Sequence, residues 1–501
     1  MEAARTHKTG NADLWLILLL AAVLRLWALD LKAPHFDEGI NGWFADRLRE
    51  TGTFAYDPTN YHGPWHFYAL FVSQSLLGRT LWALRLPVVA ASLLCIPVLF
   101  LFGRWFGRNA VRWAALAFAV SPACVFYGRY SIHEPWFVLF TMLFTWGAIA
   151  LWRDRSRAGL WAAAGGLTGM ILNKETWMIH AGSLALAAGV FALWNRISPV
   201  SPAARRAVKR QWTARDAWAA AGASMFLLVF FYSGNFFNPM GLTGPFETLA
   251  AWTKTGVAGN GHEKTTYDLL PFVNYYWLAV LVRYEWPALI GLAWSVRHVG
   301  RSPAVPRLLA IQAAGVLLAY SLVPYKTPWC IISILWPWLL FFGAAIETSA
   351  RWRGRIAGVL LLAISLAMAL RLNFREYEND AEPYVYVQTY NSIATLTRPL
   401  LHAAQRDPRM YQTSGAICID SYYPLPWILG DFPNIAYHGG QWPASLADAD
   451  FIVVASKDAE KARALAGSGH VQRRFRLRSG MEECTVFLSP KILRAAGENP
   501  P

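Results

Sequence analysis

Charged residues are scarce in this sequence. Of its 501 residues only 15% are Asp, Glu, Lys or Arg, whereas 55% are hydrophobic and 15% are aromatic. An ordinary soluble protein of this length carries more charge and fewer apolar residues. The scarcity of charge therefore argues against a string of soluble domains and indicates a membrane protein.

Cysteine is scarce as well. The chain has five cysteines and no Cys-X-X-Cys pair. Cys95, Cys124 and Cys330 lie in or beside apolar runs, where we expect small buried hydrophobes. Cys418 and Cys484 lie in the more polar C-terminal part, and a disulfide between them is one possibility if that part is outside the cytoplasm.

Acidic residues are fewer than basic ones, at 31 against 46, which gives a net charge of +15. Such an excess of positive charge is found in nucleic-acid-binding proteins. Here, however, the basic residues lie in short loops between apolar runs and not on one face. Positive-inside anchoring in a membrane explains them better, so we expect a lipid bilayer as partner and no nucleic acid.

Long apolar runs are what the sequence does contain. About eleven of them are close to the ~17–25 residues that a helix needs to cross a bilayer. They predict a mainly α, polytopic bundle of transmembrane helices. The runs occupy residues 14–30, 83–103, 111–128, 135–152, 158–173, 176–195, 217–234, 271–295, 307–323, 329–346 and 356–372.

The loops between the runs predict an orientation. With Arg5 and Lys8 in the cytoplasm, every strongly basic loop falls on the inner side, as the positive-inside bias requires. This assignment needs residues 64–78 to remain on the outer face, as a short amphipathic or re-entrant helix. The basic loops are 103–112, 153–157, 196–215 with Arg205 and Arg206, 297–307 and 350–355.

The chain is expected to form two domains of a multi-pass protein of the plasma or inner membrane. Residues 1–372 form the transmembrane domain, and its first outer loop, 31–82, carries juxtamembrane helices. Residues 373–501 form a small extracytoplasmic α/β domain of roughly 120 residues, a plausible domain size. Strands are predicted within 415–423, 450–456 and 484–490, and a helix at 459–465.

Acidic, histidine and lysine residues gather at the predicted outer ends of the helices, whereas the inner loops are almost purely basic. Packing of the bundle would bring these ends around one cavity. Carboxylates there suit a general base or a divalent cation, and lysines suit an anionic phosphate. Together they suit transfer of a group off a phosphate. The residues are Asp37, Glu38, His133, Glu134, Lys174, Glu175 and Lys326.

Each of these residues also has a simpler interpretation. An Asp-Glu pair is usually a solvated loop, although Gly39 and Gly42 after it allow a tight turn. His62 is as well suited to a turn as to a site, and Lys326 to a helix end. His262 and Glu263 are typical loop residues that a site also uses.

Five motifs then occur in an order that resembles the polytopic glycosyltransferases of the C-type fold, above all the protein mannosyltransferase and aminoarabinose transferase group (glycosyltransferase family 39 and relatives). PHFDEG resembles that group's acidic motif after the first helix, and YHGPWHFYAL resembles its His/Lys-Pro-Pro-Leu segment. LWALRLPVVAASLL resembles an Ala-Arg-Leu-Pro helix start. SPACVFYGRYSIHEPW resembles a Ser-Pro…Arg…Asp segment, and LNKET resembles Leu-Thr-Lys-Gly. In addition to these five, PYKTPW is similar to a lysine-containing loop before a late helix.

The resemblance implies a membrane glycosyltransferase that moves a sugar from a polyprenyl-phosphate donor to a glycan, lipid or protein acceptor with inversion. Asp37 matches the catalytic base, and Glu38 or Glu134 would orient the acceptor or bind metal. A divalent cation such as Mg²⁺ or Mn²⁺ would lie at Asp37 and Glu134. The donor phosphate would contact Lys174, Lys326, Arg129 and His62. Acceptor or loop roles fall to His133, His262 and Glu263.

Two other classes remain open. One is a polytopic lipid or sugar transporter, or a flippase-associated protein, without transferase chemistry. Transporters usually bind substrate near the bilayer midplane between repeated halves, whereas the charge here lies at helix ends. The other is a sensor or scaffold whose tail binds glycans. Incubation with a radiolabelled polyprenyl-phosphate sugar separates the three, because only a transferase passes the sugar on.

Overall fold

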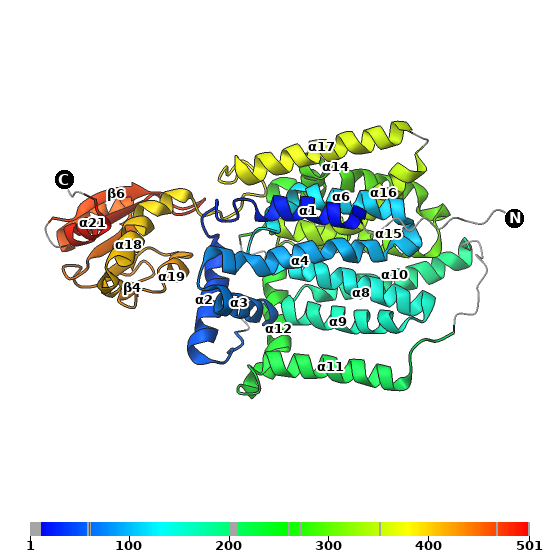
Figure 1. The fold of residues 1–501 in the computed structure, drawn as a ribbon, viewed down its shortest axis with the longest axis horizontal. Helices are drawn as coiled ribbons and strands as arrows, with labels where there is room; N and C mark the ends of the chain where they lie inside the picture. The colour runs from blue at the N-terminus through cyan, green and yellow to red at the C-terminus, as the bar shows by residue number, and fades with distance from the viewer. Residues whose placement is uncertain are drawn as a thin grey trace. The chain divides into compact units, whose positions relative to one another are not determined.

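The computed structural model describes residues 12–57, 60, 62–199, 209–258, 261–270, 273–349, 352–466 and 469–498. Arg5, Lys8, Arg205 and Arg206, on which the predicted orientation partly rests, lie outside these ranges. The described chain is a helical bundle followed by a small α/β region, so the predicted fold class is confirmed (Figure 1).

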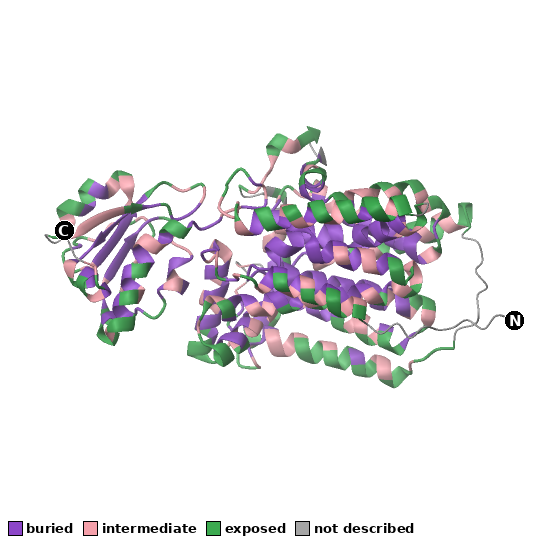
Figure 2. Cartoon of the chain, turned by 45° about the horizontal axis from the view of Figure 1, so that its top comes forward, coloured by how far each residue is buried: buried purple, intermediate pink, exposed green. Residues whose placement is uncertain are grey.

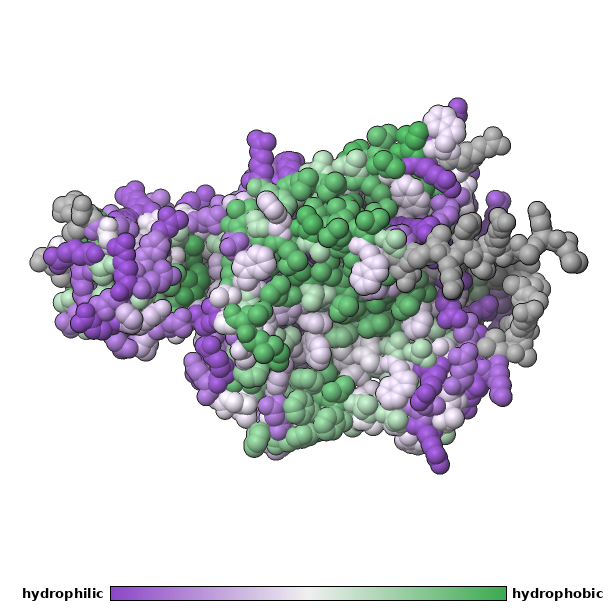
Figure 3. Space-filling model, viewed as in Figure 1, coloured by the Kyte–Doolittle hydropathy of each residue, from purple (hydrophilic) through white to green (hydrophobic). Residues whose placement is uncertain are grey.

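Seven of the described helices are long and apolar enough to cross a membrane. Apolar side chains cover much of the visible face of the bundle, as expected of helices surrounded by lipid (Figure 3). The seven are α4 (Leu81–Leu101, continued to Phe106 by α5, Gly103–Phe106), α8 (Glu134–Asp154), α10 (Trp177–Ile197), α11 (Ala214–Tyr232), α15 (Ala304–Leu322), α16 (Ile331–Thr348, preceded by a 3-10 turn) and α17 (Trp352–Phe374).

The predicted number of about eleven spans is not confirmed. Two predicted spans, α1 (Ala12–Leu26) and α9 (Arg157–Asn173), are helices of 15 and 17 residues. Two others are each broken into two shorter helices. The broken spans are α6 (Arg108–Val120) with α7 (Pro122–Tyr127), and α13 (Tyr276–Tyr284) with α14 (Trp286–His298).

The two breaks satisfy each other's polar groups. Ser121 ends α6 and accepts a hydrogen bond from the Cys124 amide at 3.2 Å. Glu285, between α13 and α14, accepts from the Ser121 hydroxyl and from the Ala123 amide, both at 2.7 Å. Buried main-chain groups at helix ends need such partners, and the apolar runs alone did not predict where they would be.

The chain divides into two compact units. The first comprises residues 1–29, 48–78 and 85–375, and the second comprises 30–47, 79–84 and 376–501. The predicted transmembrane domain ended at 372 and included all of 31–82. In the structure, residues 30–47 and 79–84 pack with the C-terminal residues.

The first unit is built around α16, almost all of which is buried. Buried residues fill the interior of the bundle, and exposed ones lie on its outside (Figure 2). Helix α8 packs on α9, α16 packs on α6 and α14, and α10 packs on α15. Gly166 lets α9 approach α8 closely, since a Cβ there would lie 2.4 Å from the Phe144 amide nitrogen. Other elements of this unit are α3 (Trp65–Leu77), α12 (Gly244–Ala258), β1 (Asp268–Leu270) and β2 (Val273–Asn274).

The second unit contains a five-stranded sheet in the order β4-β3-β5-β7-β6. Strands β4, β3 and β5 are parallel, and β7 and β6 continue the sheet antiparallel. The strands are β3 (Gly415–Cys418), β4 (Ile435–Tyr437), β5 (Phe451–Ala455), β6 (Val471–Phe475) and β7 (Cys484–Leu488), and the helices are α18 (Ala394–Arg406), α19 (Leu425–Ile428), α20 (Ala459–Leu465) and α21 (Pro490–Ala496).

Each face of this sheet carries its own core. Ile417, Val453 and Val486 belong to one apolar cluster, together with residues of α18 and α21. Ala416, Ile452 and Phe487 belong to the other, together with residues of α20. The three predicted strands and the predicted helix 459–465 are present; β4, with three residues, and β6, with two arginines, were missed.

Candidate functional site

Five predicted site residues meet in the first unit, and we call them the helix-end cluster: His62, His133, Glu134, Lys174 and Glu175. His62 precedes α3, His133 and Glu134 begin α8, and Lys174 and Glu175 connect α9 to α10. His62 and Lys174 form a short antiparallel bridge, which ties the segment before α3 to the end of α9. The segments are far apart in sequence, so packing of the bundle brings them together.

Lys174 and Glu134 form an ion pair at the centre of this cluster. Both side chains are buried, with 5% and 4% of their surface exposed. The Lys174 ammonium also lies 3.8 Å from the Cys330 sulfur. Burial by itself lowers the pKa of Lys174, but the neighbouring thiol and carboxylates outweigh burial and hold the pKa well above its ordinary value. Lys174 is therefore held in its charged form, opposite the Glu134 carboxylate.

His62 and Glu175 form the second pair, with 3.0 Å between Nδ1 and Oε2. Burial by itself raises the pKa of Glu175, but His62 and Lys174 outweigh burial and lower it, so the carboxylate stays ionised. The His62 side chain is 29% exposed, against 5% for Glu175. His62 is thus the member of this pair that an external molecule can reach.

His133 lies between two other imidazoles. Its ring centre is 4.2 Å from that of His62 and 4.6 Å from that of His66. Burial lowers the pKa of His133 well below its ordinary value, and the neighbouring His62, His66 and Lys174 lower it further. His133 is therefore a neutral imidazole at physiological pH, suited to hydrogen bonding and not to holding an anion by charge.

Gly63 explains a departure from the motif that the sequence resembles, where a proline stands. A Cβ at Gly63 would lie 2.2 Å from the Leu172 carbonyl oxygen, so the segment approaches α9 too closely for a side chain. The Gly63 amide also donates to the Asn173 carbonyl at 3.2 Å, which proline cannot do. The glycine therefore positions His62 beside Lys174.

The acidic pair Asp37–Glu38 belongs to the second unit and begins α2 (Phe36–Thr51). The Glu38 carboxylate accepts from the His35 amide at 2.8 Å, and the His35 ring nitrogen Nδ1 accepts from the Asp37 amide at 3.1 Å. The Glu38 bond is the one that a capping box makes, whereas the His35 ring caps the second helical amide and not the third. Glu38 is fully buried, whereas the Asp37 side chain is 31% exposed. Of the two carboxylates, Asp37 remains accessible.

The expected tight turn after the pair is wrong, because Gly39 and Gly42 are helical. They lie on one face of α2, three residues apart, and that face packs against residues 424–427. A Cβ at Gly39 would lie 2.5 Å from Pro424, and one at Gly42 would lie 2.4 Å from the Trp427 ring. The glycines thus permit close packing of α2 on the C-terminal residues, not a change of chain direction.

Arg79 fixes the same helix to the C-terminal residues. It bonds both oxygens of Asp46 at 3.0 Å and also donates to the Trp427 carbonyl. These contacts, with the glycine face of α2, are why residues 30–47 and 79–84 belong to the second unit.

Arg478 is a neighbour of the acidic pair that sequence analysis missed. Its guanidinium lies 4.2 Å from the centre of the Phe36 ring and donates to the Ser421 hydroxyl at 2.7 Å. Burial lowers the pKa of Arg478 to about 10, and Asp37 acts in the opposite direction. A cation over 400 positions later in the sequence thus lies within electrostatic range of Asp37, and nothing in the local sequence indicates it.

Arg129 and Lys326 bond main-chain carbonyls in the first unit. The Arg129 guanidinium donates to the Trp27 and Ala28 carbonyls at 2.7 and 2.6 Å, beyond the end of α1. The Lys326 ammonium donates to the Tyr320 and Ser321 carbonyls, both at 3.0 Å, at the end of α15. Both cations cap helix C-termini, a common structural role.

Of the two residues proposed from the loop before β1, His262 lies near Lys326. Its carbonyl accepts from the Lys326 amide at 3.2 Å, and its ring centre lies 4.5 Å from that of Tyr325. Glu263 is partly exposed and forms no hydrogen bond or ion pair with any described residue.

The described residues do not fit the predicted metal site. No group of three His, Cys, Asp or Glu side chains within them has an arrangement that could hold a metal ion. Glu134 is already paired with the Lys174 ammonium, whose charge opposes a cation beside the same carboxylate. We therefore derive no step of the chemistry through a metal.

Comparison with known proteins supports the resemblance given by the motifs. Residues 61–205 match the family model described as dolichyl-phosphate-mannose-protein mannosyltransferase. All five residues of the helix-end cluster lie within that range, whereas Asp37 and Lys326 lie outside it. A comparison with curated protein sequences gives no match.

The solved structures that match have low sequence identity but similar length. ArnT from Cupriavidus metallidurans bound to undecaprenyl phosphate is 15% identical, with a TM-score of 0.59, over 95% of this chain and 98% of that one. The apo state of the same protein is 13% identical, with a TM-score of 0.60, over 96% of this chain and 99% of that one. The Archaeoglobus fulgidus oligosaccharyltransferase in complex with Zn and sulfate is 12% identical, with a TM-score of 0.51, over 91% of this chain and 69% of that one. The chain thus has the C-type glycosyltransferase fold, as the motifs indicated.

Proposed function

We propose that this integral membrane protein is a glycosyltransferase that takes a sugar from a polyprenyl-phosphate donor and passes it to an acceptor outside the cytoplasm. The observation that carries the proposal is the helix-end cluster, where Lys174 supplies a buried positive charge beside the accessible His62. The family model covers this cluster, and a protein of the same fold binds undecaprenyl phosphate. Both support a lipid-phosphate donor.

The cluster suits the leaving group of such a reaction. When the bond between the anomeric carbon and the phosphate oxygen breaks, negative charge grows on the lipid phosphate. Lys174 would stabilise that charge, and His62 would donate a hydrogen bond to a phosphate oxygen. Glu134 and Glu175 hold these two side chains in place through their pairs. His133, being neutral and buried, is suited to positioning His62.

Asp37 is proposed as the base. Its carboxylate takes the proton of the acceptor hydroxyl or amine as the acceptor attacks the anomeric carbon from the side opposite the phosphate, which inverts that centre. Its partial exposure and the contacts that occupy Glu38 favour Asp37 over its neighbour. Glu38 is better suited to holding the start of α2 than to chemistry.

Arg129 and Lys326 remain predicted phosphate contacts with weaker support. Their side chains already bond main-chain carbonyls, and a phosphate would have to replace some of those bonds. The Lys174 ammonium has three N–H groups and, among the described residues, hydrogen-bonds only Glu134 and Cys330, so it can donate to a phosphate while Glu134 keeps its partner.

The test uses the full-length protein in liposomes with a radiolabelled polyprenyl-phosphate sugar. A transferase produces free polyprenyl phosphate and passes the label to water or to an added acceptor. A transporter or flippase moves the intact labelled lipid between leaflets and leaves the sugar–phosphate bond unbroken. If every donor tested moves between leaflets intact and none is cleaved, the transferase is rejected in favour of a transporter or flippase.

A further inference from the structure

The α/β region of the second unit contains a cavity of about 360 Å³. It lies where β3 and β5 end and where β7 begins, and its lining includes Asp420, Ser421, Trp442, Asp458 and Glu482. A cavity of this volume is within the range of small-molecule sites. None of these residues belongs to the helix-end cluster or to the acidic pair.

The topology of the sheet explains why a cavity forms at this edge. After β3 the chain crosses to β4 on one side, and it then returns to form β5 on the other side of β3. The connections after β3 and β5 therefore leave in opposite directions. A crevice opens outside the carboxyl ends of parallel strands at such a point, and it is where open α/β sheets bind their ligands.

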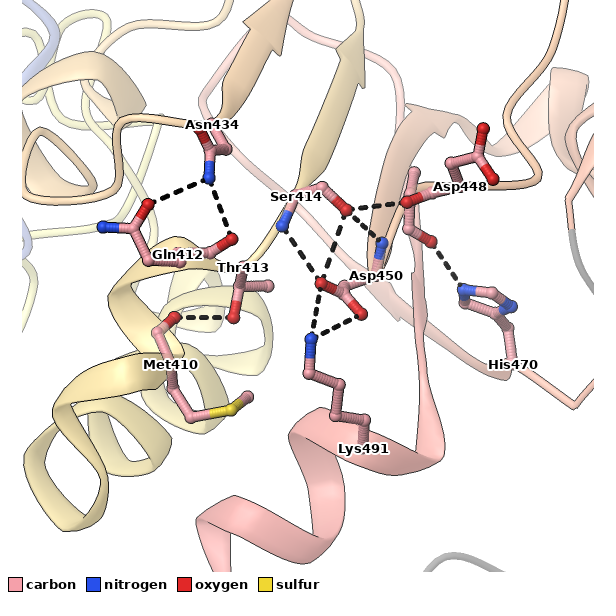
Figure 4. Close-up of polar contacts among 10 residues, drawn as sticks. Met410, Gln412, Thr413, Ser414, Asn434, Asp448, Asp450, His470 and Lys491 are labelled. Atoms are coloured by element: carbon pink, nitrogen blue, oxygen red, sulfur yellow. Dashed lines mark hydrogen bonds and ion pairs between the residues drawn. The ribbon is translucent and has the colours of Figure 1, made fainter.

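The opposite edge of the same sheet is closed by polar contacts (Figure 4). There the Asp450 carboxylate, before β5, accepts from the Ser414 amide at 3.1 Å and pairs with Lys491 of α21 at 3.1 Å. The Ser414 hydroxyl donates to the Asp448 carbonyl at 2.7 Å. Polar groups at the amino ends of the strands thus bond one another, and that edge offers no comparable set for a ligand.

At the cavity the carboxylates of the lining are available to a ligand. Neither Asp420 nor Asp458 forms a side-chain hydrogen bond or ion pair within the described part of the chain. Glu482 pairs with Lys457 at 2.9 Å, and both are largely exposed. The lining carries three carboxylates and one ammonium. This excess of negative charge disfavours phosphates, nucleotides and acidic sugars.

Trp442 supplies an aromatic wall beside these acids. The Lys461 ammonium lies 4.1 Å from its ring centre and covers one face. The loop before it turns through Gly439 and Gly440, which have φ of +56° and +78°. Gly440 leaves no room for a side chain, because a Cβ there would lie 1.8 Å from an oxygen of Asp420. The loop therefore holds the indole and the carboxylate of Asp420 at the same cavity.

We propose that this cavity binds a saccharide unit that carries no negative charge. Carboxylates accept hydrogen bonds from sugar hydroxyls, and an indole packs against the apolar C–H face of a sugar ring. Ser421 of the lining bonds Arg478, which stacks on Phe36 beside the proposed base. The ligand would be a sugar unit of the acceptor, an assignment that rests on the proposed function, whereas the binding itself does not.

Binding is measured first, without donor, on the full-length protein in nanodiscs. A fluorescent preparation is applied to an array of neutral, amino and acidic glycans, and the affinity for the best binders is then measured by titration calorimetry. We expect neutral or amino glycans to bind and glucuronic acid and sugar phosphates to bind at least about tenfold more weakly, since like charges repel in the cavity. Absence of binding across the array, or preference for acidic glycans, would overturn the proposal.

Two variants locate the binding in this cavity. Trp442→Ala should weaken it about tenfold, and Asp420→Asn, an exposed side chain whose loss leaves the core unchanged, about fivefold. Glu460→Gln removes the same charge from α20 outside the lining and should leave the affinity unchanged. If Asp420→Asn and Glu460→Gln both bind like the wild type, the site is elsewhere.

The same preparation separates this inference from the proposed function. Glycan binding without any sugar transfer would leave the site standing and reject the transferase. Sugar transfer without glycan binding would reject the saccharide site and leave the transferase standing. If glycan binding and sugar transfer are both observed, Asp420→Asn should raise the KM for a bound glycan acceptor by about fivefold and leave donor hydrolysis unchanged.

Discussion

Two lysine–glutamate pairs, one in each unit, show how environment changes the same chemistry. Lys174–Glu134 in the bundle has side chains 5% and 4% exposed, and Lys457–Glu482 beside the α/β cavity has side chains 66% and 61% exposed. The buried charges lose most of their hydration, so each depends on its partner. The exposed charges keep water as an alternative partner. In the bundle a pair is part of the structure, whereas at the cavity it leaves charge available to a ligand.

The same difference separates the two carboxylates at the start of α2. Glu38 is buried and bonds the His35 amide, whereas Asp37 is 31% exposed. Burial therefore distinguishes the carboxylate that holds the start of α2, Glu38, from the carboxylate that is able to meet a substrate, Asp37.

Asp37→Asn should lower the rate of sugar transfer by about 10²–10⁴-fold, because the amide cannot accept the acceptor's proton. The accessible side chain contributes little to folding, so the melting temperature should stay close to that of the wild type. The rate is measured with saturating radiolabelled donor and acceptor, and stability by thermal unfolding of the same preparation.

Glu38→Gln is the matched control for Asp37→Asn. It should mainly lower stability, by about 0.5–2 kcal/mol, through the weakened cap of α2. Near wild-type transfer by folded Asp37→Asn, or a larger rate loss in Glu38→Gln, would show that exposure does not identify the base.

Lys174→Met should destabilise the protein by about 3–5 kcal/mol, since it leaves Glu134 buried without its partner. The double variant Lys174→Met/Glu134→Leu should recover much of that loss, because it removes both charges. Unfolding of each variant is followed by intrinsic tryptophan fluorescence in detergent. The double variant should still fail to bind the polyprenyl-phosphate donor, which separates the phosphate role of Lys174 from its structural role. Wild-type donor affinity in the folded double variant would contradict the proposed phosphate site.

The bundle and most of the helix-end cluster were predictable from the sequence because charge is conspicuous among apolar residues. Glu134 and Lys174 each interrupt or follow a long apolar run, and such positions at helix ends indicate a shared site. The side chains that Glu134 and Lys174 contact were not predictable from the sequence. Cys330 was expected to be an inert buried residue, yet its sulfur lies beside the Lys174 ammonium. Which helix end meets which depends on packing and not on local sequence.

The second unit was less predictable because its informative residues are ordinary in sequence. Asp420, Trp442 and Glu482 become neighbours only through the strand order, which three predicted strands did not define. The start of α2 did carry a signal that was missed: His35 is followed three residues later by Glu38, the spacing of a capping box. The glycines after it suggested a turn because their helical packing on residues 424–427 is a tertiary effect.

The bond between Cys418 and Cys484 was one possibility, and the structure has both as free buried thiols. Cys418 on β3 pairs with Val454 on β5, whereas Cys484 on β7 pairs with the next residue, Ala455. The two thiols therefore lie on opposite faces and about 10 Å apart, two strand spacings, which is too far for a disulfide.

Lys326 allows a pH test between the two extremes of burial. Burial lowers its pKa to about 8, against the ordinary 10.5. The side chain is an ammonium ion below that value and a neutral amine above it, while a sugar phosphodiester keeps one negative charge throughout. If Lys326 adds to the field at the phosphate, donor binding should weaken a fewfold as pH rises through 8, a loss of about 0.5–1 kcal/mol. Binding is measured between pH 6.5 and 9.5.

The control for this pH effect is Lys326→Arg, which stays charged across the whole range and should bind equally at both ends. Stability should change in the opposite direction. Between about 8 and 10.5 the unfolded chain holds the proton that the folded chain has lost, so the free energy of unfolding rises with pH in the wild type. A rise in stability without any change in donor binding would assign Lys326 to capping α15 alone.

The smallest effect belongs to the exposed pair. Lys457→Met and Glu482→Gln should each change the free energy of unfolding by less than about 1 kcal/mol, and a double-mutant cycle should give a coupling of about 0.2–1 kcal/mol that falls with added salt. Glycan affinity responds differently, because Glu482→Gln replaces a charged acceptor of the cavity with a neutral amide, while Lys457→Met removes only the opposing charge. A coupling as large as that of Lys174 with Glu134 would mean that the cavity rim is closed in solution. The charges of Lys457 and Glu482 would then be part of the structure and not available to a ligand, and the proposed saccharide site would lose one of its acceptors.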